Sequence, residues 1–229
     1  MREGTSHDRY RNSLWERPVT PNLQDRWNAD VGGLPGAETA KASAFDEIIA
    51  AHSQAHRRYH GVGHLEALFA LLDKHAQSVA EALPLHFGVW WHDVVYEPQA
   101  SDNEARSAAL ARARLTEMGA AHDLVGRVDM LILATRSHWE GPTMGDGDYF
   151  LDADIAILGA PPSVYDQYAD DVRAEYSFAP DPMYRAGRSQ FLSKAIERQA
   201  LFRKAEFEAA YGAAARENMR RELGRLGGA

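Results

Sequence analysis

The sequence predicts an all-α protein that folds as a single domain, and three observations carry this prediction. Apolar residues recur every three or four positions along most of the 229 residues, as they do on the buried face of an amphipathic helix. No segment shows the sustained alternation of apolar and polar residues that marks a half-exposed strand. The chain contains no internal repeat, low-complexity tract or interdomain linker. We therefore expect an irregular segment over residues 1–22 and one helical domain over residues 23–229.

Individual helices are predicted from apolar spacing and from start signals. A short helix is expected near Leu23–Val31, between the turn-rich stretches "RPVTPN" and "GGLPGAE". The next two helices are amphipathic and rest on apolar residues three and four apart: Phe45, Ile48 and Ile49, then Leu65, Leu68, Phe69 and Leu72. Five more helices lie between Gly- and Pro-bearing connections: Asp123–Thr135, Tyr149–Leu158, Ser163–Tyr176, Tyr184–Arg198 and Ala213–Leu226.

Two further segments have distinctive patterns. The stretch "LPLHFGVWWHDVVY" is almost uniformly apolar, and Pro84 near its start suits the first turn of a buried helix. Its β-branched residues leave a strand open as the alternative. The stretch "SDNEARSAALARARL" begins with Ser101 and has Glu104 three residues later, which predicts a capping box at the start of a helix.

Composition excludes several kinds of site. The chain has no cysteine, so disulfides, thiolate catalysis and Cys-based metal sites are ruled out, and any metal must bind nitrogen and oxygen. The net charge of -8 argues against stable nucleic-acid binding, because basic surface supplies most of that attraction. No apolar run approaches the ~20 residues that a membrane-spanning helix needs. The start "MREGTSHDRY" is polar, and we expect a cytoplasmic protein without membrane contact.

Three histidines and an aspartate fall in two apolar-edged segments, "RRYHGVGH" and "VWWHDVV". A metal site without sulfur uses imidazoles and carboxylates from segments that converge in space. Asp93 stands among Trp90, Trp91 and valines, where an unpaired carboxylate would be costly to bury, so a cation is expected beside it. The alternative is a His92-Asp93 pair at a helix end that backbone groups satisfy.

Other candidate ligands also have plainer interpretations. Gly61 follows His60, which predicts that His60 lies on a turn while His64 begins a helix, and either one could be a solvated histidine. In "FLDADIAILG", Asp152 could cap a helix N-terminus. Asp154 lies deeper in the apolar pattern and is harder to explain as a cap.

The order His64, then His92-Asp93, then Asp154 resembles the H…HD…D signature of the HD superfamily of metal-dependent phosphohydrolases. The stretches "YHGVGHLEAL", "HDVVYEP", "SDNEARSA", "FLDADIAILGAPPSVYDQY" and "YRAGRSQFL" together resemble one bacterial branch of that superfamily, over residues 27–223. This resemblance implies an HD-domain or phosphodiesterase-like helical bundle. It also implies a divalent metal bound by those four residues, with Asp152 supporting them from behind.

Resemblance also implies catalytic roles. The "YH-x3-H" arrangement is similar to that of cyclic-nucleotide phosphodiesterases, which implies that His60 is a general acid, although Gly61 stands where those enzymes carry Asn. Glu97 lies four residues after Asp93, so on a continuous helix it could orient the attacking water, and otherwise it is a solvated helix-end acid. For Glu104 the capping box suffices as an explanation, with a catalytic role as the second possibility.

Three residues are candidates for substrate contact. His138 in "TRSHWE" could touch phosphate or a second metal, and otherwise lies on the surface. Arg185 and Arg188 are three apart on an expected helix and could fork onto a phosphate, or form an exposed basic face. The pair Tyr165 and Tyr168 could stack on a base, although core packing explains it more simply.

Together these features predict a metal-dependent phosphohydrolase that hydrolyses a small phosphate ester or a nucleotide with a metal-activated water. The alternative is a catalytically silent HD-domain protein that binds a metal or senses a ligand. Ligand type is compatible with Mn, Mg, Zn, Fe or Ni. The expected partner is a small phosphorylated substrate.

Overall fold

The computed structural model describes residues 22–227, and its regular structure there is entirely helical, without a β-strand, which confirms the all-α prediction. Apart from Asn22, the predicted irregular segment lies outside the described residues. No helix within the described range is long and apolar enough to cross a membrane. In chain order the α-helices are α2 Leu23–Val31, α3 Glu38–His52, α4 Val62–Lys74, α5 Ala82–Trp91, α6 Asn103–Glu117, α7 His122–Ala134, α8 Gly147–Ile155, α9 Pro162–Glu175, α10 Asp181–Ile196, α11 Ala205–Phe207 and α12 Ala213–Gly227.

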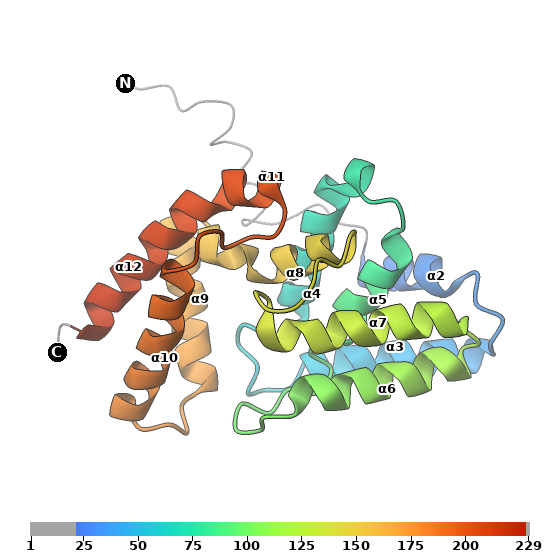
Figure 1. Ribbon diagram of the computed structural model, residues 1–229. Coiled ribbons are helices and arrows are strands. Elements are labelled where there is room, and N and C mark those ends of the chain that lie inside the picture. The colour runs from blue at the N-terminus through green and yellow to red at the C-terminus, as the bar shows by residue number, and fades with distance from the viewer. Residues whose placement is uncertain (1–21, 228–229) are drawn as a thin grey trace.

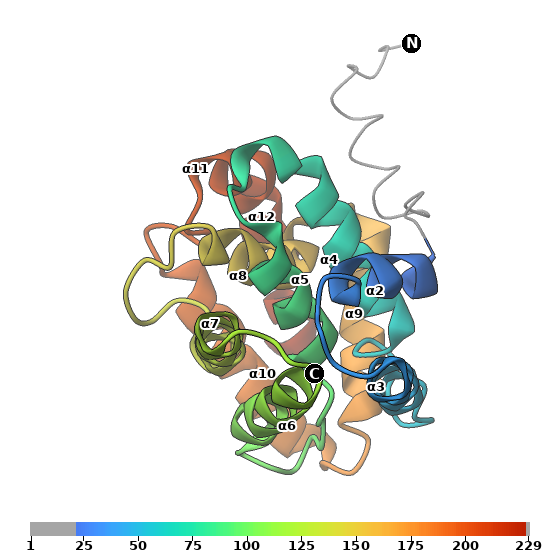
Figure 2. The same cartoon turned by 90° about the vertical axis from the view of Figure 1, so that its right-hand side faces the viewer.

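The helices form two groups that α4 and α8 join (Figure 1). In one group α6 packs along α7, with α5 and α3 against them; in the other α10 packs along α12, with α9 nearby. Figure 2 views α3, α6 and α7 nearly end-on, around α5. One hydrophobic core extends through both groups, from Trp27 in α2 to Met219 in α12.

An aromatic cluster fixes α5 in this core. Trp27 contacts Phe87 and Trp90 edge to face, with ring centroids 6.3 and 5.4 Å apart. The Nε1 of Trp90 donates to Asp30 Oδ2 at 2.8 Å, and His86 Nδ1 lies 2.7 Å from Asp30 Oδ1. Full burial of an aromatic side chain contributes ~1.5–3 kcal/mol. The cluster therefore holds the C-terminal end of α5, where His92 and Asp93 follow, in a fixed position.

Two predicted boundaries on either side of the α5–α6 connection are wrong. The helix expected through "VWWHDVVY" ends at Trp91, where the chain turns away; the strand alternative is also excluded, since the segment up to Trp91 is helical. The capping box at Ser101 and Glu104 does not form, because α6 begins at Asn103 and its N-cap makes no side-chain hydrogen bond. The Asn103 amide instead bonds the backbone N–H and carbonyl of Glu97, which ties the α5–α6 connection to the start of α6.

A close contact between α8 and the C-terminal segment generates a stability prediction. Gly159 ends the 3₁₀ turn after α8, and a Cβ there would lie 2.6 Å from the carbonyl oxygen of Tyr211. Because that atom is backbone, we expect Gly159→Ala to lower the free energy of unfolding by ~1–3 kcal/mol in urea denaturation. Gly224→Ala is the control, since its Cβ would meet nothing within 4 Å. Equal stability of the two variants would contradict the packing described here.

Candidate metal centre

Four polar side chains meet where α4, α5 and α8 cross. His64 lies in the first turn of α4, His92 and Asp93 directly follow α5, and Asp154 lies in the last turn of α8. The Nε2 of His64 lies 3.2 Å from His92 Nε2 and 3.0 Å from Asp154 Oδ1. Asp93 Oδ2 lies 3.1 Å from His92 Nε2 and 3.8 Å from His64 Nε2. The structure thus brings together all four residues predicted as metal ligands.

The hydrogen bonds of His92 leave its Nε2 atom available to bind a cation. Its Nδ1 donates to the Val89 carbonyl oxygen at 3.0 Å, so in the neutral ring Nε2 carries a lone pair. That lone pair faces another imidazole nitrogen and two carboxylates. Ligand atoms of His64, His92 and Asp154 lie within 4.8 Å of one another, and a cation among them would satisfy them together. Nitrogen and carboxylate oxygen are donors that divalent transition metals accept, so the residues fit a metal ion.

The pKa values of His92 and Asp154 also indicate that this group favours a positive charge. Burial alone would lower the pKa of His92, but Asp93 and Asp154 raise it well above its usual value. Burial would likewise raise the pKa of Asp154, yet His92 and the hydrogen bonds from His138 and His64 hold it well below its usual value. The arrangement therefore favours positive charge at this point.

His138 belongs to the surroundings of the group. It lies in the loop after α7, and its Nε2 is 2.7 Å from Asp154 Oδ2, while Asp154 Oδ1 is the oxygen nearest His64. Arg203 holds this loop, because its guanidinium donates to the carbonyl oxygens of His138 at 2.7 Å, Glu140 at 2.6 Å and Pro142 at 2.9 Å. His138 therefore orients the Asp154 carboxylate.

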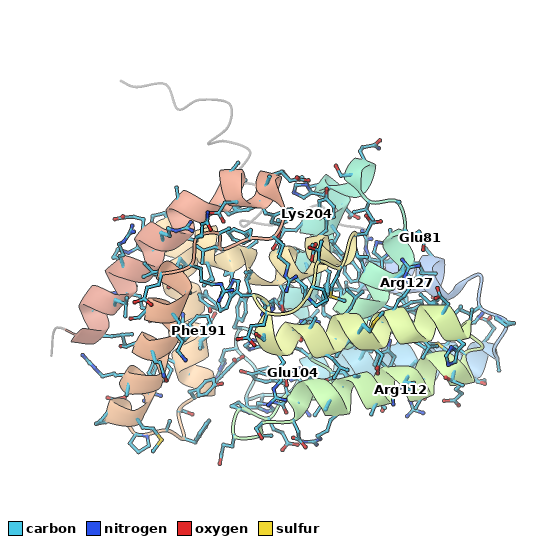
Figure 3. All side chains as sticks on the ribbon, in the orientation of Figure 1. Glu81, Glu104, Arg112, Arg127, Phe191 and Lys204 are labelled. Carbon is cyan, nitrogen blue, oxygen red and sulfur yellow. The ribbon has the colours of Figure 1, made fainter. Side chains whose placement is uncertain are left out.

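Asp152 has a structural partner of its own. The N-terminus of α8 is at Gly147, so the interpretation of Asp152 as a helix cap is wrong. Its carboxylate accepts hydrogen bonds from the backbone nitrogens of Arg203 at 2.8 Å and Lys204 at 2.7 Å. Burial raises the pKa of Asp152 to about 6. Through these two bonds Asp152 holds the Arg203–Lys204 segment against α8. Lys204 is labelled in Figure 3.

His60 lies on the turn before α4, as predicted, and the Glu175 carboxylate holds it there. Glu175 Oε2 is 2.7 Å from His60 Nδ1 and accepts from the Tyr96 hydroxyl at 2.8 Å. Glu175 Oε1 accepts from the backbone nitrogens of Arg58, Tyr59 and His60 at 2.7, 2.8 and 3.0 Å. Burial would raise the pKa of Glu175, but its bond from His60, with that from Tyr96, lowers it to about 2.

Within residues 22–227, Nε2 is the nitrogen of the His60 ring that has no hydrogen-bond partner, because Nδ1 is bound to Glu175. The His60 ring centroid lies 5.8 Å from that of His64 and 4.2 Å from that of Tyr96, on which it stacks. Burial would lower the pKa of His60, but Glu175 and Asp93 raise it above its usual value. His60 therefore lies beside the metal-ligand group and not within it.

Arg57 connects the His60 turn to the segment after α5. Its guanidinium donates to the carbonyl oxygens of Asp93 at 2.5 Å and Val94 at 3.0 Å, which the end of α5 leaves without helical partners. It also reaches the His60 carbonyl at 3.4 Å. One buried side chain thus fixes the two segments that carry the histidines relative to each other.

Glu97 and Glu104, the two acids predicted to be catalytic, do not join the group formed by the four predicted metal ligands. Glu97 was expected one helical turn after Asp93, but α5 has ended by then, and Glu97 is exposed in an ion pair with Arg106 at 2.9 Å. Glu104 is half-buried in the first turn of α6, at the end of that helix nearest α10 in Figure 3. The loss of helical register explains why the spacing argument for Glu97 is wrong.

Arg185 and Arg188 do not form the predicted phosphate fork. Arg185 turns to the C-terminal end of α12 and donates to the backbone carbonyls of Arg225 and Leu226. Arg188 is buried, with its Nε and one terminal nitrogen bound to the two carboxylate oxygens of Glu222 at 2.8 and 3.0 Å. Nor do the two arginines form an exposed basic face, because each has an internal partner.

Glu175 and Arg57 were missed by sequence reasoning. Glu175 had a usable signal: it follows Tyr168, Ala169 and Val172 on the buried face of α9, where a carboxylate needs a partner. Arg57 had none, since "RRYH" does not distinguish the buried arginine from its exposed neighbour. No family model, no curated protein and no solved structure matches the chain. The geometry described above therefore stands without support from relatives.

We expect Glu175→Gln to lower the free energy of unfolding by ~2–4 kcal/mol, measured by urea denaturation. An amide replaces one acceptor oxygen with a donor, so at least one N–H or O–H that now bonds Glu175 would lose its partner. The control is Glu66→Gln, on the exposed face of α4, which should change stability by less than ~0.5 kcal/mol. A similar small change in both variants would mean that Glu175 does not hold the His60 turn.

A pH dependence follows from His52, at the end of α3. Burial lowers the pKa of His52 to about 3, and its Nε2 has no hydrogen-bond partner. The unfolded chain binds a proton at this ring near pH 6.5, whereas the folded chain does not, so stability falls as pH drops from about 6.5 towards 3. His52→Leu should flatten the slope of stability against pH by up to ~1.4 kcal/mol per unit in this window. Exposed His122→Leu is the control, and equal slopes in the two variants would refute the assignment.

Proposed function

We propose that this chain is a metal-dependent phosphohydrolase that acts on a small phosphate ester or a nucleotide. The observation that carries the proposal is the convergence of His64 Nε2, His92 Nε2 and Asp154 Oδ1 within 4.8 Å, with Asp93 beside them. The resemblance of the same residues to the H…HD…D pattern adds support. A divalent cation held there supplies Lewis-acid chemistry: it lowers the pKa of a water and neutralises charge on phosphoryl oxygens.

The chain's own residues position the ligand atoms. The Val89 carbonyl fixes the His92 ring with Nε2 towards the centre, and His138 fixes Asp154 with Oδ1 towards His64. Arg57 fixes the backbone at Asp93. These contacts limit the reorganisation that binding of a cation would require.

His60 is the proposed general acid. Glu175 keeps a proton on Nδ1, so Nε2 is the atom that can hand a proton to the leaving oxygen. Glu175 also stabilises the protonated ring, because its carboxylate remains charged. His60 and Glu175 form a dyad in which Glu175 is the positioning residue.

The second candidate is a metal-binding or ligand-sensing protein without turnover. The observation that favours it is the position of Glu97, which was expected to orient a water but lies exposed beside Arg106. Both candidates require the metal, and only the first requires hydrolysis.

The test is metal content by elemental mass spectrometry after reconstitution with manganese, zinc or magnesium, together with hydrolysis of p-nitrophenyl phosphate. We expect about one ion per chain in the wild type and a bound-metal content lower by about tenfold or more in His92→Ala, which removes a ligand. Exposed His122→Ala is the matched control and should keep the metal and the activity. Metal without hydrolysis of any ester would select the second candidate, and absence of metal in the wild type would overturn both.

A further inference from the structure

A cavity of about 730 Å³ adjoins His60 and lies between the segment after α5, the end of α9 and α10. Its size falls in the range of small-molecule sites, ~300–1,000 Å³. Figure 3 shows one of its lining residues, Phe191, on the side of α10 that faces α6 and α7. We propose that this cavity binds the alcohol part of the substrate, and that this part carries a flat, uncharged ring system of about the size of a purine. That the substrate is a phosphate ester rests on the proposed function. That a flat ring system binds in the cavity rests on the cavity alone.

The cavity offers no free charge to a ligand. Arg188 is its cationic lining residue, and Glu222 neutralises it through two hydrogen bonds. His60 is bound to Glu175. Burial raises the pKa of Tyr96 and Tyr176 above the usual value and that of Tyr184 to about 12, so these three hydroxyls stay neutral. A phosphate or carboxylate moved into this space would lose its water without gaining a counter-charge, so the part of the ligand bound here is uncharged.

The walls suit a flat ring. Tyr96, Tyr168, Tyr176 and Tyr184 line the cavity, and aromatic side chains bind flat rings by stacking and edge contacts. The rim is apolar as well. Four large apolar side chains within residues 22–227 are strongly exposed, and two of them, Phe178 and Met183, lie on this cavity. A bound ring system would cover apolar surface that now faces water.

The position of the cavity fixes the direction of the substrate. His60 lines the cavity, and its ring centroid lies 5.8 Å from that of His64. Tyr168, on the cavity wall, contacts Tyr59 at 4.7 Å between centroids, and Tyr59 contacts His64 at 4.9 Å. An ester with its ring in the cavity therefore directs its phosphate towards His60 and the metal-ligand group.

The first experiment compares AMP with ribose 5-phosphate on the manganese-reconstituted protein. In both compounds the phosphate is esterified to the primary 5-hydroxyl of a ribose, so their intrinsic reactivity is matched and a difference in kcat/KM reports the ring. We expect AMP to be favoured by about tenfold or more. The cavity variant is Gly187→Leu: Gly187 lines the cavity on α10, and a Cβ there meets nothing within 4 Å, so the substitution adds apolar bulk at the cavity wall without a clash at Cβ.

Gly187→Leu should reduce the AMP preference to about threefold or less. Gly224→Leu, at an exposed helical glycine with the same free space, should keep it. Equal kcat/KM for the two esters in the wild type would overturn the inference, as would an equal loss for both esters in Gly187→Leu.

Titration calorimetry with adenosine separates this inference from the proposed function, because adenosine has no phosphate. We expect adenosine to bind the wild type and Gly224→Leu, and to bind Gly187→Leu about tenfold more weakly or worse. Adenosine binding without hydrolysis of any ester would support the cavity and overturn the phosphohydrolase. Hydrolysis of both esters without adenosine binding would leave the phosphohydrolase in place and overturn the cavity assignment.

Discussion

Two imidazole nitrogens lie 3.2 Å apart inside a helical core, and each has a carboxylate oxygen of Asp93 and one of Asp154 within 3.8 Å. This group needs a positive charge, and the surrounding architecture depends on that need. The atoms come from α4, from the segment directly after α5 and from α8, so the crossing of these helices must be held against the mutual repulsion of Asp93 and Asp154. The aromatic cluster around Trp90 holds α5, and the contact of Gly159 with Tyr211 holds the end of α8. The fold therefore keeps together side chains that would separate if they were free.

Charged side chains replace regular backbone hydrogen bonds around this crossing. Three segments there leave the helical ladder: the turn before α4, the segment after α5 and the loop after α7. Each has a buried or half-buried charged partner: Glu175 accepts three backbone N–H groups of the first, and Arg57 and Arg203 donate to carbonyls of the second and third. Buried backbone groups must be paired, and here the pairing also fixes His60, Asp93 and His138 in space. The same contacts serve stability and site geometry.

The helices were predictable because apolar spacing is a local property of the sequence. The expected bounds of α2 match, and those of α7, α9 and α12 are within a residue or two. The proximity of His64, His92, Asp93 and Asp154 could be anticipated only through the resemblance, since spacing along the chain does not specify which helices cross. Glu97 was misplaced for a related reason: the helix stops at Trp91, and Arg57, a residue far away in sequence, bonds the carbonyl oxygens of Asp93 and Val94 in the segment that follows. Long-range partners of this kind leave no local signal.

An acidic chain that acts on a phosphate ester must place its positive charge very locally. Arg57, Arg188 and Arg203 lie near the site, yet each is committed to carbonyls or to a carboxylate of the protein. These three arginines are therefore not free to bind phosphate, and the proposed function assigns that role to a cation at the His64 group and to His60. Aromatic side chains line the neighbouring cavity, and its arginine, Arg188, is paired with Glu222, so the role we propose for it is to select the organic group attached to the phosphate. Under the proposed function, the metal-ligand group beside His60 thus determines reactivity, and the cavity that His60 also lines determines specificity.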